Sequence, residues 1–494
     1  MKKRKHGGDP LKCLKEEIVN GRVGNIRVNS KIVSDEDVFI ALEGTRQDGH
    51  DFLREAVKKG ARYCIVSDKK RVSRCRRIGR SVILGVRDTR QALSELAYEL
   101  YERPADKLNV TGITGTNGKT TVAFLIEKIF RDAGKRTGLI GTIHYKIGRK
   151  KIRADRTTPD ALSLNGYLDR MFRSGVTHAV MEVSSHALDQ KRAAHVFFDT
   201  AVFTNITPEH LDYHKNMDAY FRAKMKIFSN LKRGGKIALN IDDPRLRAVR
   251  SKLPETVVTF GAKRRADIYA RDISCTADGS CFTVVTPVGT YPVGTALLGA
   301  YNVSNILAAF SAAYGQGLKP EDIACSIEGF RYPPGRLEGI DCGQPFRVYV
   351  DYAHTDDALA NVLIALRPLT KKRIITVFGC GGDRDRSKRP RMGAVSSELS
   401  DFTIVTSDNP RTEKQEDIAG EIEEGIINGG GKYCVILDRK DAITCAFRMA
   451  RRGDIVLIAG KGHETEQIIG QTRLKFDDRK VARDVLGKRG YSCS

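Results

Sequence analysis

The sequence contains no tryptophan, and aromatic residues account for only 7% of its 494 residues. This composition provides no aromatic-rich surface of the kind on which nucleic-acid bases stack. The sequence also lacks an apolar run long enough to span a membrane, and no apolar stretch follows its basic first residues as a secretion signal requires. We therefore expect a cytoplasmic protein without membrane insertion.

Cysteine is present, but it lacks any spacing typical of a metal or disulfide framework. The eleven cysteines include no C-x-x-C pair. A chain of this length does not depend on disulfides for its stability. We expect the cysteines to be reduced and mostly buried.

Basic residues outnumber acidic residues, which gives a formal net charge of +24. Seven of the basic residues lie between Lys69 and Arg80, a stretch without any acidic residue. Such a stretch is typical of a nucleic-acid contact or of a solvated surface. The other basic residues are interleaved with acidic ones, so we favour the solvated surface and expect no nucleic-acid partner.

Short apolar runs typical of strands, such as 109–113, alternate with helical patterns along most of the chain. This alternation predicts an α/β fold with mostly parallel, doubly wound sheets. Pro104 begins a linker, and the two prolines and the glycine of 332–335 interrupt the alternation before it restarts. We expect three domains: a smaller N-terminal α/β domain (1–104), a central P-loop domain (105–334) and a C-terminal Rossmann-like α/β domain (335–494).

The strongest single motif is G-I-T-G-T-N-G-K-T-T at 112–121, between an expected strand and an expected helix. Backbone N–H groups of such a loop bind phosphate, Lys119 can reach the terminal phosphates, and Thr120 can hold Mg²⁺. The spacing differs from the common G-x-x-x-x-G-K-[ST] loop because Ile113 occupies the first glycine position. The predicted ATP contacts in the loop are Gly115, Thr116, Asn117, Gly118, Lys119, Thr120 and Thr121.

Five further blocks follow in order: M-E-V-S-S-H at 181–186, N-I-T-P-E-H-L-D at 205–212, Y-N-V-S-N at 301–305, G-R-L-E at 335–338 and D-Y-A-H at 351–354. The phosphate loop resembles that of the Mur ligases and of their relative folylpolyglutamate synthetase, and the ordered series resembles the Mur ligase family. The resemblance implies that Asn302 contacts adenine, that Arg336 and Asp351 bind ATP, and that Glu182 and His210 hold Mg²⁺. Without the resemblance, Glu182 and His210 could equally be structural polar residues at strand ends.

Lys224, in the segment Y-F-R-A-K at 220–224, stands where the family carries a lysine that reacts with CO₂. The resemblance therefore implies an N6-carboxylysine, a carbamate, at this position. A carbamate offers anionic oxygen ligands to Mg²⁺, whereas an ammonium would be repelled. Without the resemblance, a lysine on a helix would be interpreted as a solvated surface charge.

Three blocks follow expected strands of the last domain: F-G-C-G-G-D-R-D-R-S-K-R-P at 378–390, S-D-N-P-R-T-E at 407–413 and G-K-G-H-E at 460–464. They resemble the diaminopimelate-adding Mur ligases, in which guanidinium groups bind the distal carboxylate of the amino acid. An open alternative is that Arg411 caps the following helix or pairs with Glu413. The residues expected to bind diaminopimelate are Arg384, Asp408, Asn409, Pro410, Arg411, Gly460 and Glu464.

The remaining substrate contacts are carried over from the same resemblance. The first domain is similar to a UDP-binding domain, although Asn29 and Lys31 replace the usual Asp and Arg on either side of Ser30. The positions that match binding of the UDP-linked muramoyl dipeptide are Ser30, Thr157, Thr158, Ser184, Gln190 and Arg192.

The resemblance implies a monomeric, Mg²⁺- and ATP-dependent ligase that adds meso-diaminopimelate to UDP-N-acetylmuramoyl-L-alanyl-D-glutamate, through an acyl phosphate, in peptidoglycan precursor synthesis. Lys119, Lys224 and His210 would be its catalytic residues. A folylpolyglutamate synthetase would use the same chemistry, but it gives no reason for the first domain or for D-N-P-R. A nucleic-acid-dependent P-loop ATPase is the alternative from another class.

Overall fold

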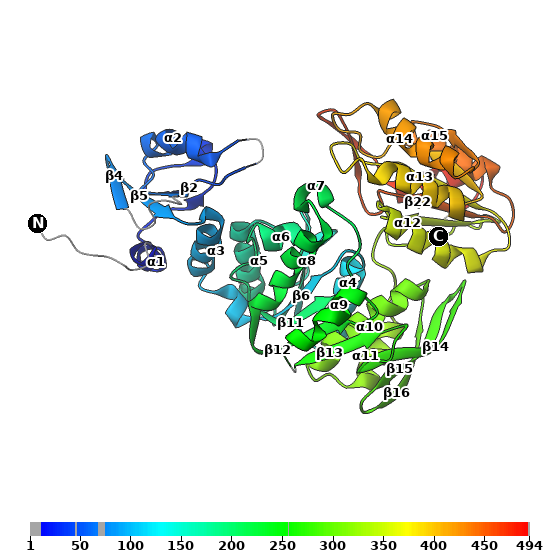
Figure 1. Ribbon diagram of the computed structural model, residues 1–494, viewed down its shortest axis with the longest axis horizontal. Helices are drawn as coiled ribbons and strands as arrows, with labels where there is room; N and C mark the ends of the chain where they lie inside the picture. Colours follow the sequence, from blue (N-terminus) through cyan, green and yellow to red (C-terminus); the bar gives the residue numbers. More distant parts are fainter. Residues whose placement is uncertain (1–10, 45–46, 68–74, 255, 493–494) are drawn as a thin grey trace, which may run out of the picture. The chain divides into compact units, whose positions relative to one another are not determined.

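The computed structural model describes residues 11–44, 47–67, 75–254 and 256–492 (Figure 1). Its internal contacts divide the chain into two compact units. The first unit comprises Met1–Thr114, Gly134–Ala201 and Ala223–Gly235, and the second comprises Gly115–Ala133, Val202–Arg222 and Lys236–Ser494. Three elements contain residues of both units: β11 (Phe198–Phe203), α8 (Met217–Met225) and β12 (Leu231–Asn240).

The first unit begins with a five-stranded sheet in the order β1-β2-β3-β5-β4. All neighbouring strands are parallel except β4, which runs antiparallel to β5. Side chains alternate between its faces, so Ile65 packs in one apolar cluster and Cys64 in another. The elements are α1 (Lys12–Val19), β1 (Ile26–Arg27), β2 (Val38–Ile40), α2 (Leu53–Lys58), β3 (Tyr63–Ser67), β4 (Cys75–Ile78), β5 (Ser81–Val86) and α3 (Thr89–Leu100).

In the same unit, β10 lies between β6 and β7 and is parallel to both, as the apolar runs predict. Glu182 at the end of β10 pairs with Ile113 near the end of β6. The carboxyl ends of these strands therefore lie side by side, where α/β sheets bind ligands. The elements are β6 (Asn109–Thr114), β7 (Thr137–Ile140), β8 (His144–Ile147), β9 (Lys150–Arg153), α5 (Ala161–Arg173), β10 (His178–Glu182) and α6 (Ser185–Asp189).

The second unit places α10 beside α4, the helix that follows the phosphate loop (Figure 1). The apolar residues of α10 are spread around the whole helix, and most of its side chains are buried, as expected for a helix covered on all sides. The strands β14 to β16 form an antiparallel ribbon. The elements are α4 (Lys119–Asp132), α7 (Leu211–His214), α9 (Pro244–Val249), β13 (Val257–Gly261), β14 (Ile268–Thr276), β15 (Gly279–Thr286), β16 (Gly289–Thr295), α10 (Ala300–Gly315) and α11 (Pro320–Glu328).

The C-terminal sheet of the second unit has the order β17-β18-β22-β19-β20-β21, and only the edge strand β17 is antiparallel. The strands are β17 (Glu338–Ile340), β18 (Arg347–Asp351), β19 (Ile374–Phe378), β20 (Phe402–Val405), β21 (Tyr433–Val435) and β22 (Ile455–Ala459), and a hairpin of β23 (Glu466–Ile469) and β24 (Thr472–Lys475) follows. The helices are α12 (Asp356–Leu366), α13 (Lys388–Leu399), α14 (Gln415–Asn428), α15 (Arg439–Met449) and α16 (Asp478–Lys488). The expected Rossmann-like α/β domain is confirmed.

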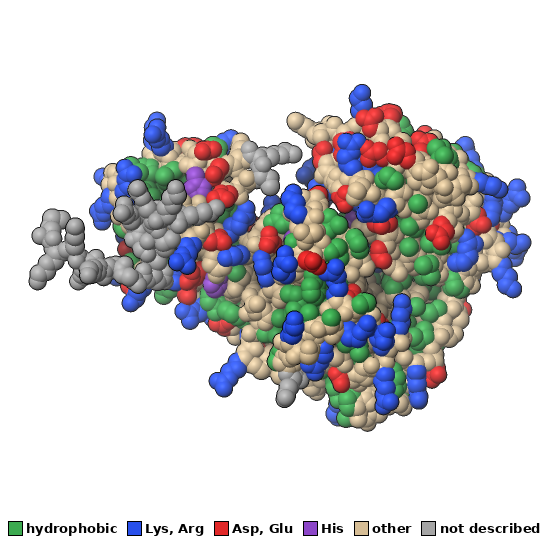
Figure 2. Space-filling model, in the orientation of Figure 1, with side chains coloured by type: hydrophobic (Ala, Val, Ile, Leu, Met, Phe, Trp, Pro, Cys, Tyr) green, Lys and Arg blue, Asp and Glu red, His purple; other side chains and the backbone are tan. Residues whose placement is uncertain are grey.

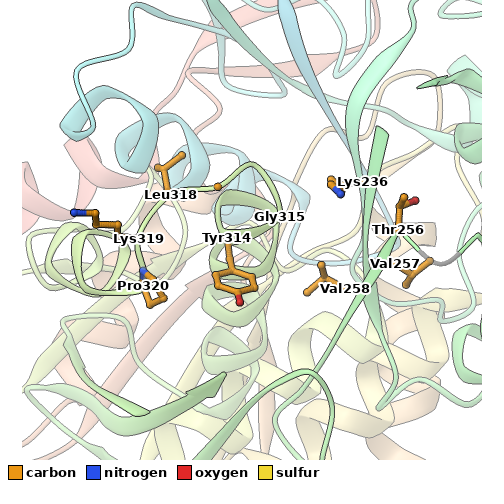
Figure 3. A pocket seen from close by; sticks show the side chains of 10 residues that line it. Lys236, Thr256, Val257, Val258, Tyr314, Gly315, Leu318, Lys319 and Pro320 are labelled. Carbon is orange, nitrogen blue, oxygen red and sulfur yellow. The ribbon is translucent and has the colours of Figure 1, made fainter. Parts of the chain in front are cut away.

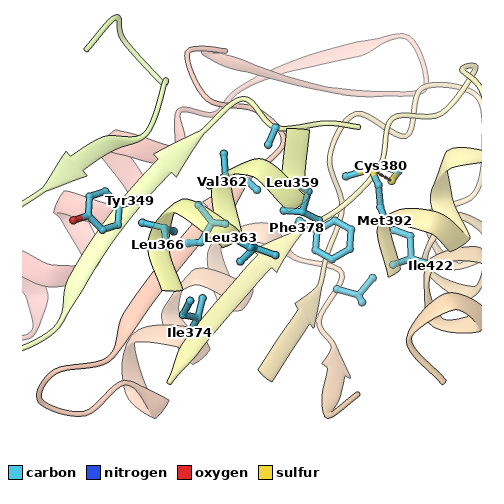
Figure 4. Close-up of a cluster of buried hydrophobic side chains, with 14 of the residues drawn as sticks. Tyr349, Leu359, Val362, Leu363, Leu366, Ile374, Phe378, Cys380, Met392 and Ile422 are labelled. Atoms are coloured by element: carbon cyan, nitrogen blue, oxygen red, sulfur yellow. Dashed lines mark hydrogen bonds between the residues drawn. The ribbon is translucent and has the colours of Figure 1, made fainter. Parts of the chain in front are cut away.

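Two apolar clusters cover the two faces of this sheet. Leu359 of α12, Met392 of α13 and Ile422 of α14 pack with Phe378 in one cluster (Figure 4). Side chains of α15 and α16 pack on the opposite face. This two-sided burial explains why β19 and β22 are buried along their whole length, as is typical of parallel strands.

The cysteines differ from the expectation of mostly buried thiols. Of the free cysteines in the described residues, only Cys64 and Cys380 are buried. Cys342 is disulfide-bonded, so the expectation of reduced thiols is wrong at this residue. The free cysteines that are exposed are Cys13, Cys75, Cys281 and Cys325.

Basic side chains are spread over the visible face together with acidic ones and do not form a single stripe (Figure 2). The part of the basic stretch that the structure describes includes β4, an exposed edge strand with Arg76 and Arg77. The rest of that stretch lies outside the described residues. No helix in the described ranges is both long and apolar enough to cross a membrane.

We expect Phe378→Ala to destabilise the C-terminal sheet by about 3–5 kcal/mol, because it leaves a cavity at a fully buried position. Hydrogen exchange of the β19 amides and thermal unfolding would measure the loss. Ile364→Ala on the neighbouring helix α12 is the control, since that side chain is 58% exposed. Equal effects of the two substitutions would contradict the packing described for Phe378.

Candidate functional site

The phosphate loop of the second unit is built on two glycines with positive φ. Gly115 has φ 141° and Gly118 has φ 87°. A Cβ atom would overlap the Thr204 hydroxyl at Gly115 and the Asn305 amide oxygen at Gly118. Helix α4 begins directly after Gly118 without a side-chain cap, so its first N–H groups face the loop as an anion site requires.

Lys119 and Thr120 occupy the positions that the sequence predicts for phosphate and metal binding. The Lys119 ammonium donates to the carbonyl oxygens of Gly115 (2.9 Å) and Thr116 (2.7 Å), so it lies over the loop. The Thr120 side chain is buried, as is that of Thr121. Arg336 Nη2 donates to Thr120 Oγ1 at 3.1 Å, which brings a second cation to the loop.

Arg336, Asp351 and Asn302 surround the same loop. Arg336 follows Gly335, and its guanidinium lies over the Tyr352 ring, 4.6 Å from the centroid. Asp351 accepts from the N–H groups of Leu337 (2.6 Å) and Ala353 (2.7 Å). Burial raises the pKa of Asp351 even though Arg336 opposes the shift. These bonds indicate that Asp351 fixes the backbone that carries Arg336.

Asn302 reaches the loop through a second asparagine. Its amide donates to Leu298 O at 2.9 Å, and its Oδ1 accepts from Asn305 Nδ2 at 2.9 Å. Asn305 is the residue that leaves no room for a side chain at Gly118. The first turns of α10 therefore lie directly beside the phosphate loop.

Two acidic residues at this site were missed by the sequence analysis. Asp357 accepts from Asn117 Nδ2 at 2.5 Å and from Thr207 Oγ1 at 3.3 Å, so it connects α12 to two loops of the phosphate site. Thr355, two residues before it, is the N-cap of α12, so a threonine followed by acidic residues in D-Y-A-H-T-D-D was a usable signal for a helix start at this site.

Glu209 is the second missed residue, and it lies among basic side chains. The Tyr220 hydroxyl donates to it at 3.3 Å, and the Nε2 atoms of His210 and His354 lie 3.6 Å and 3.7 Å from it. Burial alone would raise its pKa, but His210, His354 and Lys119 outweigh burial and hold the pKa of Glu209 well below its ordinary value. Its carboxylate therefore lies beside the predicted metal ligand His210.

Glu182 and Lys224 belong to the first unit, and both are almost completely buried, at 1% exposure. The Glu182 carboxylate accepts from the Thr142 N–H (2.9 Å) and hydroxyl (3.0 Å). The burial of Lys224 contradicts the alternative of a solvated surface charge. Burying a cation is unfavourable unless it is paired or chemically neutralised, which is consistent with a modified lysine.

The predicted muramoyl-dipeptide residues meet beside Glu182 in the first unit. Thr158 Oγ1 donates to Glu182 O (2.9 Å) and accepts from the Ser184 N–H (3.0 Å). Arg192 donates to Thr158 O (3.1 Å) and holds the Gln190 amide oxygen with two bonds. Thr157 lies 3.1 Å from the Thr142 hydroxyl. These five predicted residues form one polar network.

Ser30 is not part of that network. Its hydroxyl donates to Glu55 Oε2 at 2.7 Å, and Lys59 donates to the carbonyl oxygens of Ser30 and Lys31. Asn29 Oδ1 accepts from the Lys31 N–H and caps the turn, a role that aspartate would also fill. Asparagine in place of aspartate at position 29 therefore preserves the local backbone conformation.

The residues expected to bind diaminopimelate gather at the carboxyl ends of β19, β20 and β22. A Cβ atom at Gly381 would lie 3.0 Å from Arg411 Nη1 and 3.8 Å from Arg384 Cγ, so both arginines flank this glycine. Burial and the nearby Arg384 lower the pKa of Arg411. Two neighbouring cations are stabilised by an anion that binds both.

The other predicted residues complete this group. Asn409 accepts from Lys461 (3.1 Å) and donates to Glu464 (2.8 Å). A Cβ atom at Gly460 would lie 2.7 Å from the Asp408 carboxylate, and one at Gly382 would overlap the carbonyl oxygen of Pro410. The backbone of Asp408 to Pro410 is thus held against two glycine turns.

The alternative roles considered for Arg411 are not those observed. Glu413 is bound by Arg389, with Nη2 to Oε1 and Nη1 to Oε2 both at 2.9 Å. Arg411 donates instead to Gly382 O at 2.6 Å. Helix α14 begins at Gln415, with Lys414 as its N-cap, so Arg411 does not cap it.

A pocket of about 520 Å³ in the second unit lies away from these groups. It is open to solvent and is formed by the start of β13, the end of α10 and the turn before α11 (Figure 3). None of the predicted site residues lines it. The candidate site is therefore defined by its polar groups and not by this pocket.

Comparison with protein families gives three matches along the chain. The Mur ligase family catalytic domain matches residues 22–101, the Mur ligase middle domain matches 113–313, and the Mur ligase glutamate ligase domain matches 335–462. The UDP-N-acetylmuramoyl-L-alanyl-D-glutamate–2,6-diaminopimelate ligase of Geobacillus kaustophilus is 44% identical, covering 98% of this chain and 97% of that protein. The chain belongs to the Mur ligase family. The ligase of the same name from Alkaliphilus metalliredigens is 42% identical over 98% of this chain and 97% of that protein.

Solved structures agree with membership of the Mur ligases. A structure of a UDP-N-acetylmuramoyl-L-alanyl-D-glutamate–2,6-diaminopimelate ligase has 32% identity and a TM-score of 0.66, covering 95% of this chain and 96% of that one. A folylpolyglutamate synthase from Mycobacterium tuberculosis has a TM-score of 0.64 over 80% of this chain and 95% of that one, at 17% identity. The second likeness shows the shared fold alone.

We expect Lys119→Ala to abolish ligation, because it removes the ammonium that lies over the phosphate loop. Loss of one such group typically raises the reaction barrier by ~2.7–4 kcal/mol. Steady-state phosphate release and ATP titration would measure the effect on turnover and binding. Near-normal turnover by a folded Lys119→Ala protein would refute the assignment of this loop.

Proposed function

We propose that the chain is an ATP-dependent ligase that adds meso-diaminopimelate to UDP-N-acetylmuramoyl-L-alanyl-D-glutamate in peptidoglycan precursor synthesis. The observation that carries this proposal is the pair Arg384 and Arg411 beside Gly381, in a chain 44% identical to a diaminopimelate ligase over 98% of its length. Two guanidinium groups suit the distal carboxylate that distinguishes diaminopimelate from lysine.

The reaction divides between phosphoryl transfer and amide formation. The dipeptide's γ-carboxylate attacks the terminal phosphorus of ATP, and the bond from that phosphorus to ADP breaks, which leaves an acyl phosphate. The amine of diaminopimelate then attacks the acyl carbon, phosphate leaves, and the amine loses a proton. Lys119, Arg336 and the N–H groups at the start of α4 offset the charge on the transferring group.

The metal contacts rest on the family resemblance and on the chemistry of the donor groups. Thr120, Glu182, His210 and a carbamate on Lys224 would hold Mg²⁺, which would neutralise phosphate charge when bound. Within the described residues, no group of three His, Cys, Asp or Glu side chains is arranged as a metal site. Buried Glu182 and Lys224 fit this donor set.

Several further expectations belong to this proposal. The domains 1–104, 105–334 and 335–494 would bind the UDP group, ATP and the amino acid, respectively. The ATP contacts would include Asn302, Arg336 and Asp351, and Ser30 would contribute to UDP binding. We also expect a cytoplasmic monomer that needs no nucleic acid.

The decisive assay is phosphate release with UDP-N-acetylmuramoyl-L-alanyl-D-glutamate, ATP and a single amino acid. Release that requires meso-diaminopimelate would support the proposal. Release that requires DNA or RNA instead, or that proceeds with a folate and glutamate, would reject it.

We expect wild-type kcat/KM for meso-diaminopimelate to exceed that for L-lysine by roughly 10⁴, because a site built for charged hydrogen bonds rejects analogues that lack them. Arg411→Ala should remove most of this preference while changing the KM for ATP little. Steady-state kinetics with both amino acids would measure the two ratios. Equal kcat/KM values for the wild-type protein would show that the proposed specificity is wrong.

We expect Lys224→Ala to be nearly inactive and to be partly rescued by a short carboxylic acid, which can replace the carbamate oxygens. Mass spectrometry of the native protein under CO₂ would detect the added carboxyl group on Lys224. Full activity of a folded Lys224→Ala protein would exclude the carbamate. Lys226→Ala is the control, because that exposed lysine pairs with Asp189 on the surface.

A further inference from the structure

Arg389, the second residue of α13, is fully buried despite its charge. Its guanidinium makes four hydrogen bonds: two to Glu413 at 2.9 Å, one to Glu421 Oε2 at 3.0 Å and one to Gly381 O at 3.3 Å. Although burial by itself lowers the pKa of Arg389, the two glutamates raise it above its ordinary value. Arg389 is therefore a permanent cation that connects α13 with α14 and with the loops of Gly381 and Glu413.

These bonds connect the two loops that carry the arginines of the amino-acid site. Gly381 belongs to the loop of Arg384, and Glu413 follows Arg411 by two residues. Glu413 Oε1 also accepts from the Asp383 N–H at 2.5 Å, and Asp383 Oδ1 accepts from the Thr412 hydroxyl at 2.6 Å. The two loops are thus joined through the carboxylates of Glu413 and Asp383.

In this arrangement Glu413 does not pair with Arg411 or Arg384, although both arginines lie on the loops that it joins. Arg411 and Arg384 lie close enough for one to lower the pKa of the other, and Glu413 is a nearby carboxylate on the same loop. An arginine near a carboxylate ordinarily forms a charge-assisted, bidentate pair. Here the bidentate pair is formed with Arg389 instead, and Arg384 and Arg411 donate to the backbone carbonyl oxygens of Asp383 and Gly382, respectively.

We propose that Arg389 is a positioning residue that holds Glu413 away from Arg384 and Arg411, so that these two arginines bind the distal carboxylate of the amino-acid substrate. This inference rests on the proposed function. Without Arg389, Glu413 would turn towards Arg411 and compete with the substrate. Removing the Glu413 charge in the same protein would end that competition.

The test compares Arg389→Met, Glu413→Gln and the double variant Arg389→Met/Glu413→Gln. If competition by Glu413 removes one hydrogen bond to a charged group, the affinity for the amino acid changes by roughly 10- to 100-fold. We expect Arg389→Met to raise the KM for meso-diaminopimelate by this factor and to leave the KM for ATP within about threefold of wild type. The double variant should recover most of the lost affinity.

Arg391→Met is the matched control, because Arg391 lies on the same helix and pairs with Asp356 at the surface. It should leave both KM values unchanged. If Arg389→Met does not fold, Arg389→Lys replaces it in the series, since lysine keeps the charge but cannot bond both oxygens of Glu413. Recovery on adding Glu413→Gln is again the expected result.

A double variant no better than Arg389→Met would overturn the inference, as would an equal rise in the KM for ATP. Both results would mean that Arg389 only stabilises the fold. Failure of the proposed function has a different signature. In that case the wild-type protein would show no preference for meso-diaminopimelate, and Arg411→Ala would not alter its use.

Discussion

The second unit depends on the close backbone approach at the phosphate loop. Gly115 lies against Thr204, and Gly118 lies against Asn305, with no space for a Cβ atom at either position. Because of this contact, the loop, the start of α4 and the first turns of α10 share one geometry. Thr207 and Asp357 are joined to the loop by hydrogen bonds that a displaced backbone would break, and Asn302 is bonded to Asn305.

The carboxylates at the candidate site have specific partners in the protein interior. Glu209 is surrounded by His210, His354 and Tyr220, and Asp351 is satisfied by backbone N–H groups. Carboxylates that are already hydrogen-bonded have fixed orientations, so they fix the positions of the groups around them. The same principle holds at Arg389, which binds both Glu413 and Glu421, while Arg384 and Arg411 donate to backbone carbonyl oxygens.

Local sequence patterns were sufficient for the α/β class and for the strands that carry the site. The runs at 109–113 and 374–378 are the strands β6 and β19, and each is followed by a glycine loop. The spacing of apolar residues and the presence of turn-forming residues are local properties, so a short stretch of sequence reveals them. The antiparallel ribbon β14 to β16 was not anticipated, although its strands are joined by the two-residue turns 277–278 and 287–288, a local hairpin signal that the parallel interpretation of these residues missed.

The order of residues along the chain is enough to predict which residue types follow which strands: the phosphate loop with Lys119, and the arginines of G-G-D-R and D-N-P-R. Which charges meet depends on tertiary packing. It placed Lys224 in the interior, joined Asp357 to Asn117 across 240 positions of sequence, and paired Glu413 with Arg389 and not with Arg411. The physical reason is that the partner of a charged side chain depends on burial and distance, and residues far apart in the chain set both.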